Sequence, residues 1–441
     1  MGIRNRQRRA AKRKAKARAA DRGHQWRADS PPPRTGSGDR PMTEREAVHR
    51  LVTDGAMSND RRALELKADQ LADRHPAIVD QELEGSMLWV VGIAWDEGWQ
   101  PAELVRHARR IDGRAGRFVA TAVLADHSVR RADTLDGRWA AQVEAIEAPA
   151  VEQPTGWMVA FARREELRRI DLLILALSTL GVLMRSGRLR TILPPPGRRG
   201  ATRPSTGPTV DDPVLNKVRA LLAQAESTTF EAEAEAFTAK AQELMARHAI
   251  DVAVLWARAA SDERPTSIRL PIDDPYADIK SLLLHQVAQH SRTRAVWDAT
   301  HALSTVIGFA SDLAATELLY TSLLLQAQTA LQVEGGRAGP GARTRSRGFR
   351  SSFLLAFTHR IDQRLAAVNA AVHDAAQTEH PGALLPALVA RDHAVDDEVA
   401  RQFAELSSSR VRGGRDAVGW ARGTLAADLA HLNAGDLARP A

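Results

Sequence analysis

The sequence predicts a mainly α-helical protein, and three observations carry that prediction. Hydrophobic residues make up 44% of the 441 residues and charged residues 26%, an ordinary balance for a globular chain. Apolar side chains recur at helical spacing along most of the chain. Short strand-like runs appear within residues 265–310. We therefore expect a helical N-terminal domain, an αα-hairpin and a small α+β domain, preceded by a disordered basic N-terminal arm.

The arm and its linker occupy residues 1–41. Residues 1–27 hold eleven Lys or Arg against one acid, Asp21, which is a net charge of +10. The whole chain carries +7, so residues 28–441 sum to 7 − 10 = −3. Without an apolar stripe the basic stretch cannot bury a face, and it is predicted to be disordered on its own. Residues 28–41 are rich in Pro, Gly and Ser and form a linker.

A helical domain is predicted over residues 42–192. Thr43 and Glu46 have the spacing of a capping box, which places a first helix after Thr43. Two further helices are expected to begin at Pro76 and Pro101, since proline favours the first helical turn. Three tryptophans of this domain are expected to be core or near-core aromatics: Trp89, Trp95 and Trp99.

A further helix is expected around residues 157–190. It contains the longest apolar run of the chain, thirteen residues from Leu172 to Met184. A helix that spans a membrane needs about 20 apolar residues. We therefore predict a buried helix and no membrane span. No secretory signal follows the arm, and the predicted location is cytoplasmic.

Residues 193–210 form a second linker rich in Pro and Gly, and residues 211–262 form the predicted αα-hairpin. The first hairpin helix follows Asp212-Pro213, and a break at residues 226–228 separates it from the second. The second helix places Phe237 and Leu244 on one apolar face. Such a hairpin is expected to pack on its own chain.

The α+β module is predicted over residues 263–441, ending in a helical tail. Strands are expected at residues 267–270, 294–300 and 305–309, and helices at 279–289, 317–331, 351–372 and 418–432. Residues 335–348 read as a flexible basic loop, and Asp396-Asp397-Glu398 as a solvated acidic run.

The hairpin carries a resemblance to a known family. Its first helix holds Lys217-Val218-Arg219 and Leu221-Leu222, the turn holds Ala225 to Thr228, and the second helix holds Glu231 to Ala234 and Lys240 to Met245. Residues 214–251 with this pattern resemble the bacterial and phage domain of unknown function known as DUF2786. The resemblance implies a prokaryotic or phage protein and a mixed α/β partner domain at residues 265–370. It implies no established activity and no catalytic residue.

Several kinds of chemistry are disfavoured by the sequence. The chain has no cysteine, which excludes disulfides, thiolate metal sites and a cysteine nucleophile. His285 and His290 are five residues apart, not the four that place two histidines on one helix face, so we predict no metal. The glycines at 335–341 lack the Lys-Ser/Thr ending of a phosphate loop. No cofactor is predicted.

The basic arm is the strongest functional signal. Its cations suit the neutralisation of phosphates, so we predict non-specific binding of DNA or RNA by a non-enzymatic accessory protein. The loop cations Arg337, Arg343, Arg345, Arg347 and Arg350 are a candidate second phosphate-contacting site, although a solvated loop is the favoured interpretation of this segment. The predicted phosphate-contacting residues are Arg4, Arg6, Arg8, Arg9, Lys12, Arg13, Lys14, Lys16, Arg18, Arg343, Arg345 and Arg347.

Two alternatives remain open from the sequence. In the first, the hairpin docks a protein partner and the arm is incidental. In the second, the protein is an enzyme whose site is assembled from residues far apart in the sequence. A deep polar pocket that brings His and carboxylate side chains together would favour the enzyme.

Overall fold

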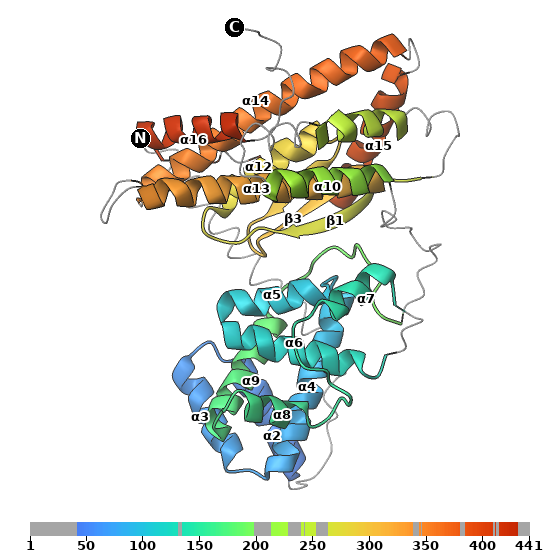
Figure 1. Ribbon diagram of the computed structural model, residues 1–441. Helices are drawn as coiled ribbons and strands as arrows, with labels where there is room; N and C mark the ends of the chain where they lie inside the picture. The colour runs from blue at the N-terminus through green and yellow to red at the C-terminus, as the bar shows by residue number, and fades with distance from the viewer. Residues whose placement is uncertain are drawn as a thin grey trace, which may run out of the picture.

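The chain folds into two lobes joined at a waist (Figure 1). The computed structural model describes residues 42–130, 135–197, 213–227, 240–241, 243–252, 263–337, 344, 346–379, 384–408, 411 and 414–430. Helices α2 to α9 build the N-terminal lobe, and the segments from α10 to α16 build the C-terminal lobe. The predicted mainly α-helical fold with a small sheet is confirmed.

The N-terminal lobe is entirely helical in its described part. Thr43 and Glu46 form the expected capping box at the start of the first helix, and Pro76 and Pro101 open two others. Its helices are α2 (Glu44–Met57), α3 (Arg61–Ala72), α4 (Pro76–Asp96), α5 (Pro101–Ile111), α6 (Gly113–His127), α7 (Gly137–Glu144), α8 (Trp157–Arg164) and α9 (Arg169–Met184).

Two of the three predicted core tryptophans are buried. Trp95 donates from its indole N–H to the Asp126 carboxylate at 2.9 Å, and Trp99 donates to the Gly187 carbonyl at 2.9 Å. Trp89 is 62% exposed, so the prediction was wrong for this residue. Trp89 and Trp95 lie on different faces of α4, and only the face that carries Trp95 turns toward α6.

The C-terminal lobe contains one antiparallel sheet of three strands in the order β1-β3-β2 among its described residues. Strand β3 is central, and both of its neighbours pair with it along their length. Its elements are α10 (Pro213–Ser227), β1 (Thr266–Pro271), α12 (Ala277–His290), β2 (Arg294–Asp298), β3 (Leu303–Gly308), α13 (Ala310–Arg337), α14 (Arg347–Glu379), α15 (Leu384–Gln402) and α16 (Ala417–Leu429).

Helices cover both faces of the sheet. Val306 points into the large core shared with α12, α13, α14 and α16, whereas Ile307 points to the other face and meets Val395 of α15. Alternate residues of a strand face opposite sides, so a strand buried on both sides is apolar at successive positions. This explains why β3 is the most buried strand of the three.

The hairpin packs on its own chain, as its apolar face predicts. Val218 and Leu222 of α10 are buried, together with Ala241 and Met245 from the helical residues 240–241 and 243–252. All four belong to the same core as the sheet and α13. Asp212 and Thr228, which flank the first hairpin helix, lie outside the described residues.

Some predicted boundaries differ in the structure. The helix expected around 157–190 is two helices, because the chain turns at Glu166, which has φ 52°. The expected loop at 335–348 is shorter, since α13 runs to Arg337 and α14 begins at Arg347. The acidic run 396–398 lies within α15, a helix that the sequence did not predict. Among the described residues, no helix combines the length and hydrophobicity that crossing a membrane requires.

Candidate nucleic-acid interface

The predicted phosphate-contacting residues fall mainly outside the described part of the chain. The nine cations of the arm lie within residues 1–41, and Arg343 and Arg345 also lie outside it. Arg347 begins α14 and is exposed. The nearby Arg350 is partly buried. Within the described residues, the candidate interface therefore lies on the folded lobes.

The N-terminal lobe carries an exposed row of arginines that we call the arginine ridge. It arises from two stretches of sequence, RHARRIDGRAGR at the α5–α6 turn and ARREELRR at the α8–α9 turn. Four acids lie in the same two stretches or just beyond: Asp112, Glu165, Glu166 and Asp171. The exposed members of the ridge are Arg109, Arg110, Arg114, Arg117, Arg163, Arg164 and Arg168.

Contacts between α6 and the α8–α9 turn hold the two stretches together. Glu165 accepts hydrogen bonds from Arg117 at 2.9 and 2.6 Å and lies 3.9 Å from Arg114. The Arg117 hydrogen bonds hold the pKa of Glu165 below its usual value, and the charge of Arg114 acts in the same direction. One carboxylate thus lies beside two guanidinium groups, so this part of the surface keeps a net positive charge.

Two ridge arginines make neither an ion pair nor a side-chain hydrogen bond among the described residues, whereas Arg164, which also has no ion pair there, donates to Thr121. Arg109 lies at the C-terminal end of α5, and Arg163 lies in the last turn of α8. Both are exposed. An exposed guanidinium without a carboxylate partner is available to a phosphate, which it can contact through two parallel N–H donors.

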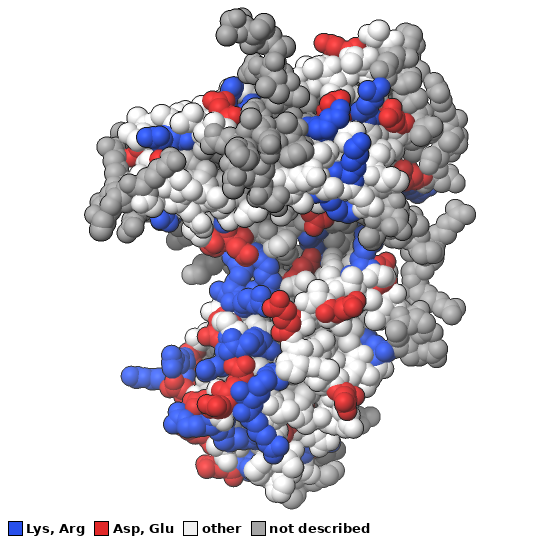
Figure 2. Space-filling view, viewed as in Figure 1, with Lys and Arg blue, Asp and Glu red and all other residues white. Residues whose placement is uncertain are grey.

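The ridge reaches the waist between the lobes. Arg110 lies 3.5 Å from Asp274, and Arg106 of the same helix contacts Asp273 at 2.5 Å. In Figure 2, Lys and Arg side chains gather along one side of the N-terminal lobe up to this waist, with acidic side chains between them. The cationic surface of the N-terminal lobe therefore meets the C-terminal lobe at the waist, and this contact depends on the two lobes keeping the same relative position.

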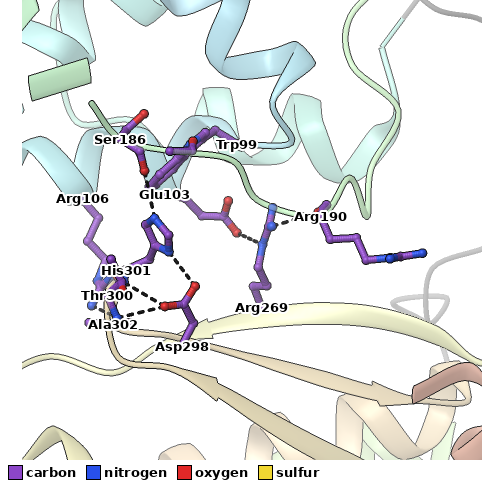
Figure 3. A network of polar contacts seen from close by, with 11 residues as sticks. Trp99, Glu103, Arg106, Ser186, Arg190, Arg269, Asp298, Thr300, His301 and Ala302 are labelled. Carbon is purple, nitrogen blue, oxygen red and sulfur yellow. Dashed lines mark hydrogen bonds and ion pairs between the residues drawn. The ribbon is translucent and has the colours of Figure 1, made fainter. Parts of the chain in front are cut away.

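A buried ion pair fixes that relation. Arg269 of β1 donates to Glu103 of α5 at 2.7 Å, and their side chains are 3% and 9% exposed. Arg269 also donates to the carbonyl of Arg190 at 3.0 Å (Figure 3). A further hydrogen bond from Arg269 goes to the carbonyl of Gly98 at 2.6 Å. Burial raises the pKa of Glu103, and the charge of Arg269 opposes that rise. One guanidinium from the sheet thus contacts three segments of the other lobe.

A histidine from the β2–β3 turn forms a second link. His301 Nδ1 lies 2.6 Å from Asp298, and its Nε2 lies 2.9 Å from the Ser186 carbonyl oxygen (Figure 3). Both ring nitrogens face acceptors, so both contacts are hydrogen bonds only when the imidazole carries its second proton. The hydrogen bond to Asp298 raises the pKa of His301. The edge of the ring also meets Trp99, with the ring centroids 5.3 Å apart.

The hairpin lies over a separate cavity of about 500 Å³, which we call the hairpin cavity. One of its lining residues, Asp312, accepts a hydrogen bond from the buried Arg391 at 3.0 Å; the side chains of Arg391 and Asp312 are 2% and 3% exposed. Burial raises the pKa of Asp312, against the charge of Arg391. The titratable residues that line the cavity are His248, His290, Arg292, Arg294, Asp312, His373, Asp374 and Asp392.

No group of three or more His, Asp or Glu side chains in the described part of the chain is placed to hold a metal ion. In the hairpin cavity, His290 is paired with Asp362 at 2.8 Å, and Arg292 with Asp392 at 3.0 Å. The cavity brings histidines and carboxylates together, which is the observation that favours the enzyme alternative.

Sequence reasoning missed the ridge and the waist. The ridge was visible as two arginine-rich stretches, but nothing in the sequence showed that α6 and the α8–α9 turn are neighbours. The partners Arg269 and Glu103 are 166 positions apart, and no local pattern marks either of them.

Comparison with known families identifies the hairpin. Residues 214–252 match the family described as Protein of unknown function (DUF2786), which confirms the resemblance of this segment. No curated protein matches the chain, and no solved structure matches it. The prokaryotic origin and the partner domain implied by the resemblance stay predictions.

Proposed function

We propose that this protein, which carries a DUF2786 hairpin at residues 214–252, is a non-enzymatic accessory protein that binds DNA or RNA by its phosphate backbone. The basic arm and the arginine ridge would supply the contacts, and the proposal places the protein in the cytoplasm. Binding of this kind needs cations on an accessible surface and carries no sequence preference.

The observation that supports the proposal best is the arginine ridge itself. Its seven exposed arginines outnumber the four acids in or just beyond the same stretches, although the chain beyond residue 27 has a net charge of −3. Positive charge is therefore concentrated on one side of a lobe that belongs to a nearly neutral body. A nucleic-acid strand lying along α5, α6 and α8 would meet it in one continuous contact.

The arm and the ridge would contribute to binding in different ways. The arm brings +10 over 27 residues and raises the rate and strength of the first encounter. The ridge offers arginines on fixed helices, which lose less freedom on binding than residues of a free arm. Removing either should therefore weaken binding, and removing both should abolish it.

The test is fluorescence anisotropy with a labelled duplex across a salt series. Four proteins are compared: the full chain, a deletion of residues 1–27, the double variant Arg109→Gln/Arg163→Gln, and Arg62→Gln as control. Arg62 is an exposed arginine of α3 outside the ridge. Because Arg109 and Arg163 make no ion pair among the described residues, their replacement removes charge without breaking a bridge.

Affinity falls as salt rises, and we expect this fall to be less steep in the ridge variant, by roughly 0.9 in the slope of log affinity against log salt for each phosphate that it no longer neutralises. The arm deletion should reduce the steepness more. The control should bind as the full chain does. Unchanged affinity in both the arm deletion and the ridge variant would remove the nucleic-acid role.

A second candidate function rests on the hairpin cavity, which holds histidines, carboxylates and a buried ion pair. Perturbed titratable groups in a cavity of this size are typical of ligand-binding and catalytic sites. Asp312→Asn tests it by calorimetry against a panel of small metabolites, of which one should bind the wild type and bind the variant more weakly. The adaptor alternative gains less support, because Leu244 is half-buried in the protein's own core.

A further inference from the structure

A second cavity opens at the waist, on the C-terminal lobe next to the end of the ridge. We call it the waist cavity; its volume is about 840 Å³. Four segments line it: residues 273–276, α12, the last turns of α13 and the first turns of α14. Among the described residues, no arginine of the ridge lines it.

Two cations of the lining have N–H donors that no described residue accepts from. Arg350 is buried at Nε, and this N–H has no hydrogen-bond acceptor in the described structure. Lys280 donates to the Asp273 carbonyl at 2.7 Å, which occupies one of its three N–H groups. Burial lowers the pKa of Lys280, and the carboxylates of Asp273 and Asp274 oppose that change. A buried donor without an acceptor is costly, so an anionic ligand would stabilise this site.

The acids of the waist cavity are already paired. Asp273 and Asp274 are its only acidic lining residues in the described part of the chain, and they contact Arg106 at 2.5 Å and Arg110 at 3.5 Å. The N-terminal lobe thus neutralises the two carboxylates at the rim. Lys280 and Arg350 remain as the positive charge that a ligand would meet, which favours an anion over a cation.

The remaining lining residues suit a planar group attached to that anion. Tyr276 is half-buried at the start of α12, where its φ of 66° holds the residue in the left-handed region. Its ring can stack on a nucleobase. Gln328 and Gln332 are one helical turn apart on α13 and carry both amide donors and carbonyl acceptors.

We infer that the waist cavity binds the phosphate monoester of a nucleotide, with the phosphate at Lys280 and Arg350 and the base against Tyr276. This inference rests on the proposed function, because it gives the nucleic-acid interface a site for a strand end. The same chemistry is offered by a free nucleotide and by the 5′-phosphate of a strand, and the experiment separates the two.

The experiment uses the full chain and four probes: adenosine 5′-monophosphate, inorganic phosphate, a hexanucleotide with a 5′-phosphate, and the same hexanucleotide with a 5′-hydroxyl. Affinities are measured by calorimetry at low salt for the wild type, Arg350→Gln, Lys280→Gln, Tyr276→Ala and the control Arg62→Gln. Thermal melting confirms that each variant is folded. Lys280 and Arg350 lie on different helices, so one variant remains informative if the other fails to fold.

We expect the phosphorylated hexanucleotide to bind at least about tenfold more tightly than the hydroxyl form, the size of effect that one charge-assisted hydrogen bond supplies. This preference should disappear in Arg350→Gln and Lys280→Gln but not in Arg62→Gln. Tyr276→Ala should weaken adenosine 5′-monophosphate and leave inorganic phosphate unchanged. If the monophosphate binds as tightly as the phosphorylated strand, the ligand is the free nucleotide; tighter binding of the strand identifies its end as the ligand.

The inference is overturned if the wild type shows no preference for the phosphate and no binding of the monophosphate. It is also overturned if the preference survives in both cavity variants. Failure of the proposed function gives a different result, since the long duplex would then fail to bind while the monophosphate still bound and still required Arg350.

Discussion

Replacing Arg269 with methionine should undock the two lobes. The change keeps an unbranched apolar stem, shorter than the arginine side chain, and removes three charge-assisted hydrogen bonds, to Glu103, Gly98 and Arg190. Glu103 then stays buried with the Gln100 N–H as its remaining donor in the described structure. Breaking a buried ion pair from one side costs about 3–5 kcal/mol, because a charge is left without its partner. We expect a decrease of that size in the free energy of unfolding.

The same reasoning predicts how pH and a second substitution modify this decrease. Without Arg269, the pKa of Glu103 is raised further by burial, so the variant's folded state gains protons as pH falls. The loss of stability relative to the wild type should therefore become smaller as pH falls toward the ordinary pKa of a glutamate. The double variant Arg269→Met/Glu103→Gln should be more stable than the sum of the single effects implies, by about 2 kcal/mol.

The assay is urea unfolding followed by tryptophan fluorescence, together with small-angle X-ray scattering of the native variants. Undocked lobes would enlarge the radius of gyration, while each lobe keeps its helices by circular dichroism. A decrease below about 1 kcal/mol, the size typical of a surface ion pair, with unchanged scattering would refute the reasoning. It would show that the buried pair does not hold the waist together.

Three further predictions concern residues at the waist. The hydrogen bond to Asp298 raises the pKa of His301 in the folded protein. The stability that protonated His301 adds is therefore complete below the pKa of the unfolded chain and is lost as pH rises through the pKa of the folded protein. His301→Asn should remove this pH dependence from melting curves above neutral pH. Burial lowers the pKa of His107 to about 4, so stability should fall as pH drops from about 6.5 toward 4, and His107→Gln should flatten that decline in the same melting assay. Gly98→Ala should destabilise by at least about 2 kcal/mol in thermal unfolding, because φ is +86° and a Cβ would lie 2.3 Å from the Leu189 carbonyl oxygen.

Local patterns in the sequence were enough to predict several elements of the fold. The capping box of α2, the start of α4 and α5 at prolines, and the three strands follow from residues close together in the chain. Helix α15 was not predicted, because its acids at 396–398 suggested solvent. Its burial depends on Val395 meeting Ile307, and on Arg391 lying over the Phe309 ring at 3.7 Å.

The candidate site was less accessible to sequence reasoning than the fold. Arginine-rich stretches are common in this chain, so those at α5–α6 and α8–α9 carried no special signal. The two stretches form one surface because Glu165 lies beside Arg114 and Arg117, and only the packing of the helices shows this contact. Arg350 was foreseen as a loop cation, but its buried Nε was not.

The position of Leu303 indicates that the two lobes do not fold as independent domains. This residue begins the central strand of the C-terminal sheet, yet its side chain belongs to the hydrophobic core of the N-terminal lobe. A fragment cut within residues 193–210 would expose Leu303 at one cut surface and leave its former neighbours uncovered at the other. Each half expressed alone should therefore tend to aggregate, and co-expression of both halves should restore a soluble pair.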